Sequence, residues 1–253
     1  MSNLFSKLKT DGLEEVQDRL GGGGFIIPTN IYKGKIKNFY GGQAESGALS
    51  ITLSLIKEDG KEYKETVYVT NKEGENFFLN PQDTSKKVPL PGFTIANDIC
   101  MIITGKPLSE QEWESKTANV WDKDAKKELP KSVDQAVDVI DQEIALGIEL
   151  QLVNVTAKSQ ASGKYEPTGE DKQQNAITKV WHPEVRMTLV EAQAGVEEEG
   201  VFWDKWLKQN EGKEIDRRKV KGGAAGGGTA GAPRSAATSS APAPKPKSSL
   251  FKK

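Results

Sequence analysis

The sequence predicts a mainly β domain followed by a disordered C-terminal tail, and three observations lead to this prediction. From Phe25 onward, apolar and polar residues alternate with the period of two that is typical of strands. Asp59-Gly60 separates two such runs, which is typical of a tight β-hairpin. Ten of the 25 glycines lie in two clusters, at 21–24 and between 222 and 231, and such clusters are typical of flexible connectors.

These observations divide the 253 residues into three parts. Residues 1–24 are predicted to be an N-terminal helical arm and a glycine hinge, and the arm either docks on the domain or binds a partner. Residues 25–216 are predicted to form the domain. Residues 217–253 are predicted to be a disordered basic tail, because their Gly, Ala and Pro content leaves too little apolar surface to order them.

Within the domain, the first elements are three consecutive antiparallel strands, predicted over residues 25–70. The segment 71–93 is predicted to be a loop. A helix capped by Thr94 is predicted to follow, with a buried stripe of isoleucines and an end at Gly105. Later strands are predicted over 117–122, 129–140 and 143–155, and the polar segment 157–175 is predicted to be a loop or hairpin tip.

Two helices are predicted to close the domain. A capping box of Thr188 and Glu191 opens the first, and the second is expected to carry Val201, Phe202 and Trp206 inward. The order of strands, one helix and more strands excludes a doubly wound fold, which needs helices between parallel strands. The best fit is an OB-type five-stranded antiparallel barrel with helical and loop insertions.

The first strand, "IYKGKIKNFY", carries the predicted binding face. Lys33, Lys35 and Lys37 alternate along it, and they are expected to face solvent because burying unpaired ammonium groups is costly. Phe39 shares their face and is predicted to be exposed. Tyr32, Ile36 and Tyr40 are expected to be mainly core unless the strand bulges, and an ordinary solvated face remains the alternative.

Composition excludes several functions. The single cysteine, Cys100, permits neither an internal disulfide nor a cysteine-based zinc site, and it fits a reducing cytoplasm. No apolar run approaches the roughly 20 residues that cross a bilayer. The single histidine, His182, has no triad pattern and is expected to pack or cap a turn. We therefore expect a non-enzymatic protein without cofactor, metal or membrane, although a nuclease built on scattered carboxylates is a weaker alternative.

Charge is distributed unevenly. Nine of the 35 basic residues and none of the 36 acidic residues lie in 217–253, which leaves 26 basic against 36 acidic residues in the body. An acidic body excludes a broadly basic surface, so a nucleic-acid site must be a groove. Lysines that alternate with aromatic residues suit single-stranded nucleic acid, because lysines contact phosphates and aromatic rings stack on bases.

The candidate DNA-binding residues are aromatic or basic and lie on the predicted strands or in the 71–93 loop. That loop could cover the groove or plug the core. The candidates are Tyr32, Lys33, Lys35, Lys37, Phe39, Tyr63, Tyr68, Phe77, Phe78, Lys86 and Lys87, with Tyr40, Trp113 and Trp121 in a wider set of aromatics, most of them expected to be core.

Several stretches together resemble one family: "MSNLFSKL", "IYKGKIK", "TNKEGENFF", "KKVPLPGF", "FWDKW" and "SSLFKK". The chain resembles the single-stranded DNA-binding protein of lytic podophages that carry a virion-packaged RNA polymerase, over most of the predicted domain and the extreme C-terminus. The resemblance implies an OB-type domain that coats single-stranded DNA in replication and recombination in the host cell cytoplasm. It also implies activation of host RNA polymerase at late promoters and assistance to a phage RNA polymerase and replication proteins.

The resemblance implies that the activation determinants are the last six residues. These are Ser248, Ser249, Leu250, Phe251, Lys252 and Lys253. Two apolar residues beside lysines are too few for a core but enough to anchor in a partner's pocket. The alternative hypothesis is a protein-only transcription adaptor, in which the barrel is a scaffold and the terminal peptides bind polymerase.

Overall fold

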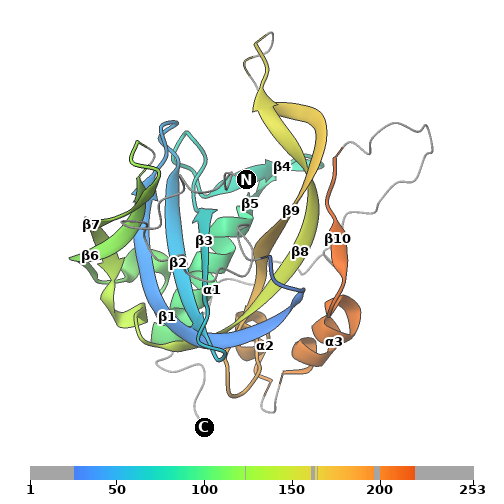
Figure 1. Cartoon of the computed structure of the whole chain (residues 1–253). Helices are drawn as coiled ribbons and strands as arrows, with labels where there is room; N and C mark the ends of the chain where they lie inside the picture. Colours follow the sequence, from blue (N-terminus) through green and yellow to red (C-terminus); the bar gives the residue numbers. More distant parts are fainter. Residues whose placement is uncertain (1–25, 123, 161–162, 164, 197–199, 220–253) are drawn as a thin grey trace, which may run out of the picture.

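The computed structural model describes residues 26–122, 124–160, 163, 165–196 and 200–219 (Figure 1). The predicted arm and the predicted tail tip lie outside these residues. The helices and strands, in chain order, are β1 (Asn30–Gln43), β2 (Leu49–Lys57), β3 (Glu62–Tyr68), β4 (Phe77–Asn80), β5 (Asp83–Pro89), α1 (Pro91–Thr104), η1 (Leu108–Glu110), β6 (Trp113–Asp122), β7 (Lys127–Ala136), η2 (Val137–Val139), β8 (Glu143–Lys158), β9 (Tyr165–Trp181), α2 (Leu189–Gln193), α3 (Val201–Asn210) and β10 (Glu214–Asp216).

One eight-stranded sheet forms the body, and its main path runs β3-β2-β1-β8, with β9 on the outer edge of β8. All of these pairs are antiparallel, and β10 adds a short parallel pair to β8. The β6–β7 hairpin joins the sheet through β7 and β1, beside the three-stranded meander (Figure 1). The predicted mainly β, antiparallel fold is therefore confirmed, as are the meander over 25–70 and a helix that ends at Gly105.

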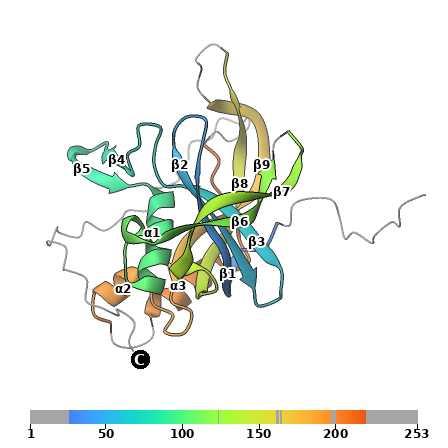
Figure 2. The ribbon, with the colours of Figure 1, turned by 90° about the vertical axis from the view of Figure 1, so that its left-hand side faces the viewer.

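Four local predictions were wrong. The 71–93 segment is not a loop, because β4 and β5 pair with each other and form a ribbon that projects from the sheet (Figure 2). Helix α1 begins at Pro91 rather than after Thr94, since a proline lacks the N–H that a first helical turn leaves unpaired. In α3, Val201 is 59% and Phe202 38% exposed, and the buried residues are Trp203 and Trp206. The 157–175 segment is mostly strand, because β8 runs to Lys158 and β9 begins at Tyr165.

A bulge in β1 decides which side chains enter the core. Ile36 pairs with Leu55 and Asn38 with Ser54, so Lys37 has no partner in the ladder and the alternation shifts by one residue there. Ile36 and Phe39, three residues apart, are consequently both fully buried. The predicted exposure of Phe39 was wrong because it assumed an unbroken period of two.

A side chain links strand β3, at the edge of the meander, to strand β9, at the edge of the β8–β9 pair. Within the described strands, β3 and β9 share no ladder, so the sheet is not closed and a five-stranded barrel is not confirmed. The Glu65 carboxylate accepts hydrogen bonds from the Ile177 backbone N–H at 2.8 Å and from the Tyr63 hydroxyl at 2.6 Å. Burial outweighs these bonds and raises the pKa of Glu65, and α1 packs against both β3 and β9 beside the gap.

We predict that Gly34→Ala destabilises the protein by roughly 2–4 kcal/mol, because the backbone must move. A Cβ atom at this position would lie 2.2 Å from the Ile56 carbonyl oxygen, in the part of β1 that pairs with β2. Gly41→Ala is the matched control on the same strand, since its nearest neighbour would be a Trp113 ring atom at 3.9 Å. Urea unfolding measures both variants, and equal stabilities would contradict the prediction.

We also predict a pH dependence that Asp98 causes. Burial in α1 raises the pKa of Asp98 to about 6 from 3.8, although the charge of Lys179 partly opposes this. A raised pKa means that the folded protein holds the proton more tightly than the unfolded chain, so stability falls as the pH rises from about 4 to 6. Asp98→Asn is expected to remove roughly 2–3 kcal/mol of this loss.

Urea unfolding between pH 4 and 7 tests this prediction on the wild type and Asp98→Asn. Asp134→Asn, which removes an exposed carboxylate from β7, controls for the change in net charge. Parallel profiles of wild type and Asp98→Asn would show that Asp98 does not cause the loss.

Candidate nucleic-acid interface

The outer face of the β1–β3 meander is a polar surface made of small side chains. Cross-strand rows place Tyr40 beside Thr52 and Thr66, and the Oγ1 atoms of the two threonines lie 2.8 Å apart. The next row brings Ser50 beside Tyr68. The opposite face carries Ile51, Leu53 and Leu55 into the core, so the polar side chains point away from it.

Two hairpins wall this surface and turn it into a groove of about 780 Å³, which we call the aromatic groove. Trp121 comes from β6, and Tyr165 comes from the start of β9, at the tip of the long β8–β9 hairpin. Trp121 is 57% exposed, Tyr165 73% and Tyr68 55%, whereas Tyr40 is buried beneath them. The groove is lined by Tyr40, Gly42, Gln43, Ala44, Glu45, Ser46, Ala48, Ser50, Thr52, Lys64, Thr66, Tyr68, Val120, Trp121 and Tyr165.

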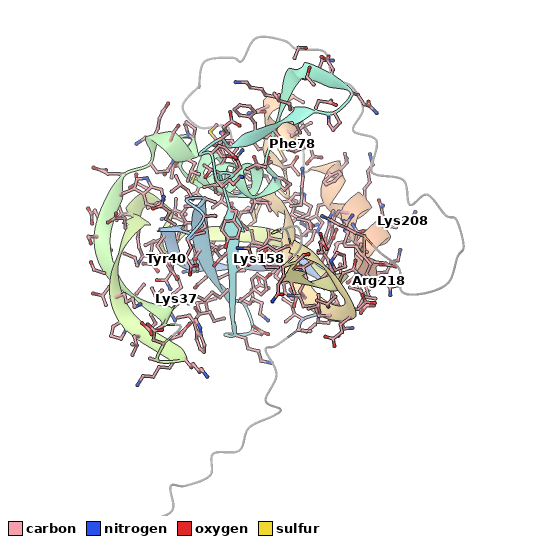
Figure 3. The ribbon with its side chains drawn as sticks, turned by 90° about the horizontal axis from the view of Figure 1, so that it is seen from above. Lys37, Tyr40, Phe78, Lys158, Lys208 and Arg218 are labelled. Atoms are coloured by element: carbon pink, nitrogen blue, oxygen red, sulfur yellow. The ribbon has the colours of Figure 1, made fainter. Side chains whose placement is uncertain are left out.

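The aromatic groove continues along β1 toward the lysines. A smaller hollow of about 200 Å³, the middle cavity, shares Lys64 with the aromatic groove and is also lined by Lys37. Lys37 in turn lines a third hollow of about 540 Å³, the lysine pocket, together with Lys33 and Lys35. Figure 3 shows Lys37 and Tyr40 together beside the β6–β7 hairpin. The three hollows therefore form one track in which consecutive hollows share a lysine.

Each lysine of the track already has a partner. Lys37 donates to Glu62 at 2.7 Å, and Lys64 donates to Glu128 at 2.8 Å and to the Asn119 carbonyl oxygen at 3.1 Å. Partial burial disfavours the charge of Glu62, but the Lys37 hydrogen bond and the nearby lysine charges outweigh it and lower the pKa of Glu62. The Lys64 pairs join β3 to the β6–β7 hairpin and so hold one wall of the groove.

At the other end of the track, the lysines are held more loosely. Lys35 lies 3.9 Å from Glu143, and both side chains are more than 60% exposed. The Lys33 ammonium lies 5.7 Å from the centroid of the Trp203 ring. Both Lys35 and Lys37 face solvent, as the sequence predicts.

Of the aromatic residues named as DNA-binding candidates, Tyr68 alone lines the groove, and Tyr40 and Trp121 of the wider set line it as well. Phe39 is fully buried and contacts the Trp113 ring, and Tyr63 is 8% exposed with its hydroxyl on Glu65, so neither can stack on a base. Tyr32 is half-buried and donates to the Pro28 carbonyl oxygen. Phe39 and Tyr63 are core residues because periodicity identifies a strand but not which residues a bulge or a side-chain bond draws inward.

The other predicted residues lie on the β4–β5 ribbon. Phe78 is 44% exposed, and the Lys87 ammonium lies 4.1 Å from the centroid of the Phe77 ring. Lys86 pairs with Asp83 at 3.2 Å. None of these residues lines the aromatic groove, and Figure 3 places Phe78 away from Tyr40 and Lys37. The ribbon therefore neither covers the groove nor plugs the core.

The predicted site omits the two most exposed aromatic residues of the groove, Trp121 and Tyr165. Trp121 belongs to the wider set of aromatics, but its strand partner is the charged residue Glu128, which signals an exposed hairpin. Tyr165 is a single aromatic in the polar run "SGKYEPTG", where no core demands it. A lone aromatic residue in a polar hairpin tip is the sequence signal that could have identified Tyr165.

No model of a protein family matches the chain, and no curated protein matches it. Among the described residues there is no group of three or more His, Cys, Asp or Glu side chains that could hold a metal ion. None of the helices within the described ranges is long and apolar enough to cross a membrane. The geometry of the track is thus the observation from which a function must be argued.

Proposed function

We propose that the protein binds single-stranded DNA without sequence preference, through the aromatic groove and the lysines that continue it. The observation that carries this proposal is the set of three exposed rings, Tyr68, Trp121 and Tyr165, that line one groove with a polar floor. Each ring offers a stacking surface worth roughly 1–3 kcal/mol per base, and stacking does not distinguish one base from another. Lys64, Lys37, Lys35 and Lys33 then supply contacts for phosphates.

The fold supports the proposal. We assign the body to the OB type, because a three-stranded meander is followed by a helix and then by two long antiparallel strands, with the first of these pairing to β1. The β4–β5 ribbon, the β6–β7 hairpin and β10 are the insertions and additions to this plan. OB-type proteins commonly bind oligonucleotides on the face of the second and third strands, between flanking loops.

We further propose roles in phage DNA replication and recombination, and activation of host RNA polymerase at late promoters through the C-terminal tip. The family resemblance is the support for these roles and for the host RNA polymerase, the phage RNA polymerase and replication proteins as partners. Ser248–Lys253 lie outside the described residues, and the chain from Gly222 to Lys247 would act as a spacer. The protein-only adaptor is the competing hypothesis, and DNA titration separates the two.

Titration with oligo-dT is the experiment that tests the DNA-binding proposal. Trp121 is the most exposed tryptophan, since Trp181, Trp203 and Trp206 are buried and Trp113 packs on Phe39. Wild type is expected to bind at about 50 mM salt, where counterion release favours binding, with quenching of its fluorescence. Trp121→Phe should bind but lose most of the quenching.

Trp121→Ala and Tyr165→Ala are each expected to weaken binding by roughly 1–3 kcal/mol, the contribution of one stacked base. Phe78→Ala is the matched control, because it removes an exposed aromatic ring that lies outside the groove. If Phe78→Ala weakened binding and the two groove variants did not, the site would lie on the ribbon. A wild type that binds no oligo-dT at low salt would contradict the proposal itself.

Deletion of Ser248–Lys253 tests the second role. The truncated protein is expected to keep its affinity for oligo-dT within about threefold and to lose co-purification with host RNA polymerase, since the tip acts as a separate anchor. A control that replaces the six residues with Gly and Ser keeps the tail length. An unchanged polymerase interaction would refute the assignment of the tip.

A further inference from the structure

The middle cavity holds as many acidic as basic side chains, which is unexpected for a phosphate-binding track. Its charged lining residues are Lys37 and Lys64, Glu62 and Glu128. Each lysine is within 2.8 Å of one of the carboxylates. The formal charge at the centre of the track is therefore zero in the free protein.

The partners of the two lysines are local and replaceable. Glu62 is 35% and Glu128 47% exposed, so both pairs are open to water on one side and both ammonium groups are accessible to a competing anion. Ion pairs at such sites contribute little net stability. A phosphate oxygen can take the place of a carboxylate oxygen, because it accepts the same charge-assisted hydrogen bond.

We propose that Glu62 and Glu128 are internal substitutes for phosphate that make the track selective for nucleic acid with accessible bases. This inference rests on the proposed function. A strand whose bases stack in the aromatic groove gains enough to displace Glu62 and Glu128 from the two lysines. A polyanion without accessible bases gains nothing from the rings, and it meets a track whose central lysines are already paired.

The charge balance has a measurable consequence for salt dependence. Binding of a single strand releases counterions in proportion to the net positive charge brought to its phosphates, with a slope of roughly −0.7 per phosphate neutralised. A lysine with a carboxylate beside it brings no net charge to the phosphates. Removing one carboxylate should therefore steepen the slope of log K against log salt by roughly 0.7.

Glu62→Gln, Glu128→Gln and the double variant test the inference, because glutamine keeps the size and a hydrogen-bond acceptor. Glu114→Gln is the matched control, since Glu114 pairs with Lys116 at 3.5 Å on the same β6–β7 hairpin but lines none of the three hollows. Thermal unfolding of every variant identifies any loss of fold. The ligands are oligo-dT and an abasic oligomer of the same length, which offers phosphates without bases.

We expect Glu62→Gln and Glu128→Gln each to bind the abasic oligomer roughly two- to fivefold more tightly than wild type, the range that a weak ion pair allows, and to show the steeper slope with oligo-dT. Glu114→Gln should match wild type in both measurements. Folded Glu62→Gln and Glu128→Gln variants that behave like Glu114→Gln, or that bind the abasic oligomer more weakly, would overturn the inference while wild-type binding to oligo-dT remains intact. Failure of the proposed function is a different result, in which wild type binds no oligo-dT.

Discussion

The bulge at Lys37 is the constraint on which the other features depend. On one edge β1 pairs with β2 both before and after the bulge, and on its other edge it pairs with β8 through Asn30–Lys35 before the bulge and with β7 at Tyr40 beyond it. One strand can serve these neighbours only if it bends, and a bulge provides the bend together with a change of face. Phe39 then enters the core and Tyr40 turns outward to the groove. The same residue that interrupts the ladder, Lys37, belongs to both the lysine pocket and the middle cavity.

The sequence identifies the fold better than the site. Local patterns predict the meander, the capping box of α2 and the end of α1, because alternation, caps and a left-handed glycine act within a few residues. The bulge, the β6–β7 wall and the pairing of β4 with β5 depend on contacts between distant segments. Phe39 shows the difference, since its chemistry suits stacking but its position after the bulge makes it core.

Site prediction fails in a second way, because it selects residues by type and not by surroundings. Lys33, Lys35 and Lys37 are recognisable as a basic face. Lys35 and Lys37 nevertheless pair with Glu143 and Glu62, which no pattern near β1 reveals. Tyr63 and Tyr68 lie on one strand five residues apart. An odd spacing on a strand puts them on opposite faces, so one binds Glu65 in the core and the other lines the groove.

Under the proposed function, the charge distribution would give different tasks to the two parts of the chain. The body is acidic, and its track carries lysines that are already paired, so long-range attraction of a polyanion by the body is weak. The segment from Arg217 onward holds nine basic residues and no acidic one, although Arg217 and Arg218 are bound to Glu149, Asp171 and Asp216 of the body. The basic residues beyond them can attract a strand over distance but offer no stacking rings except Phe251. Attraction and selection would then be separate physical steps, with the tail contributing to encounter and the aromatic groove to discrimination.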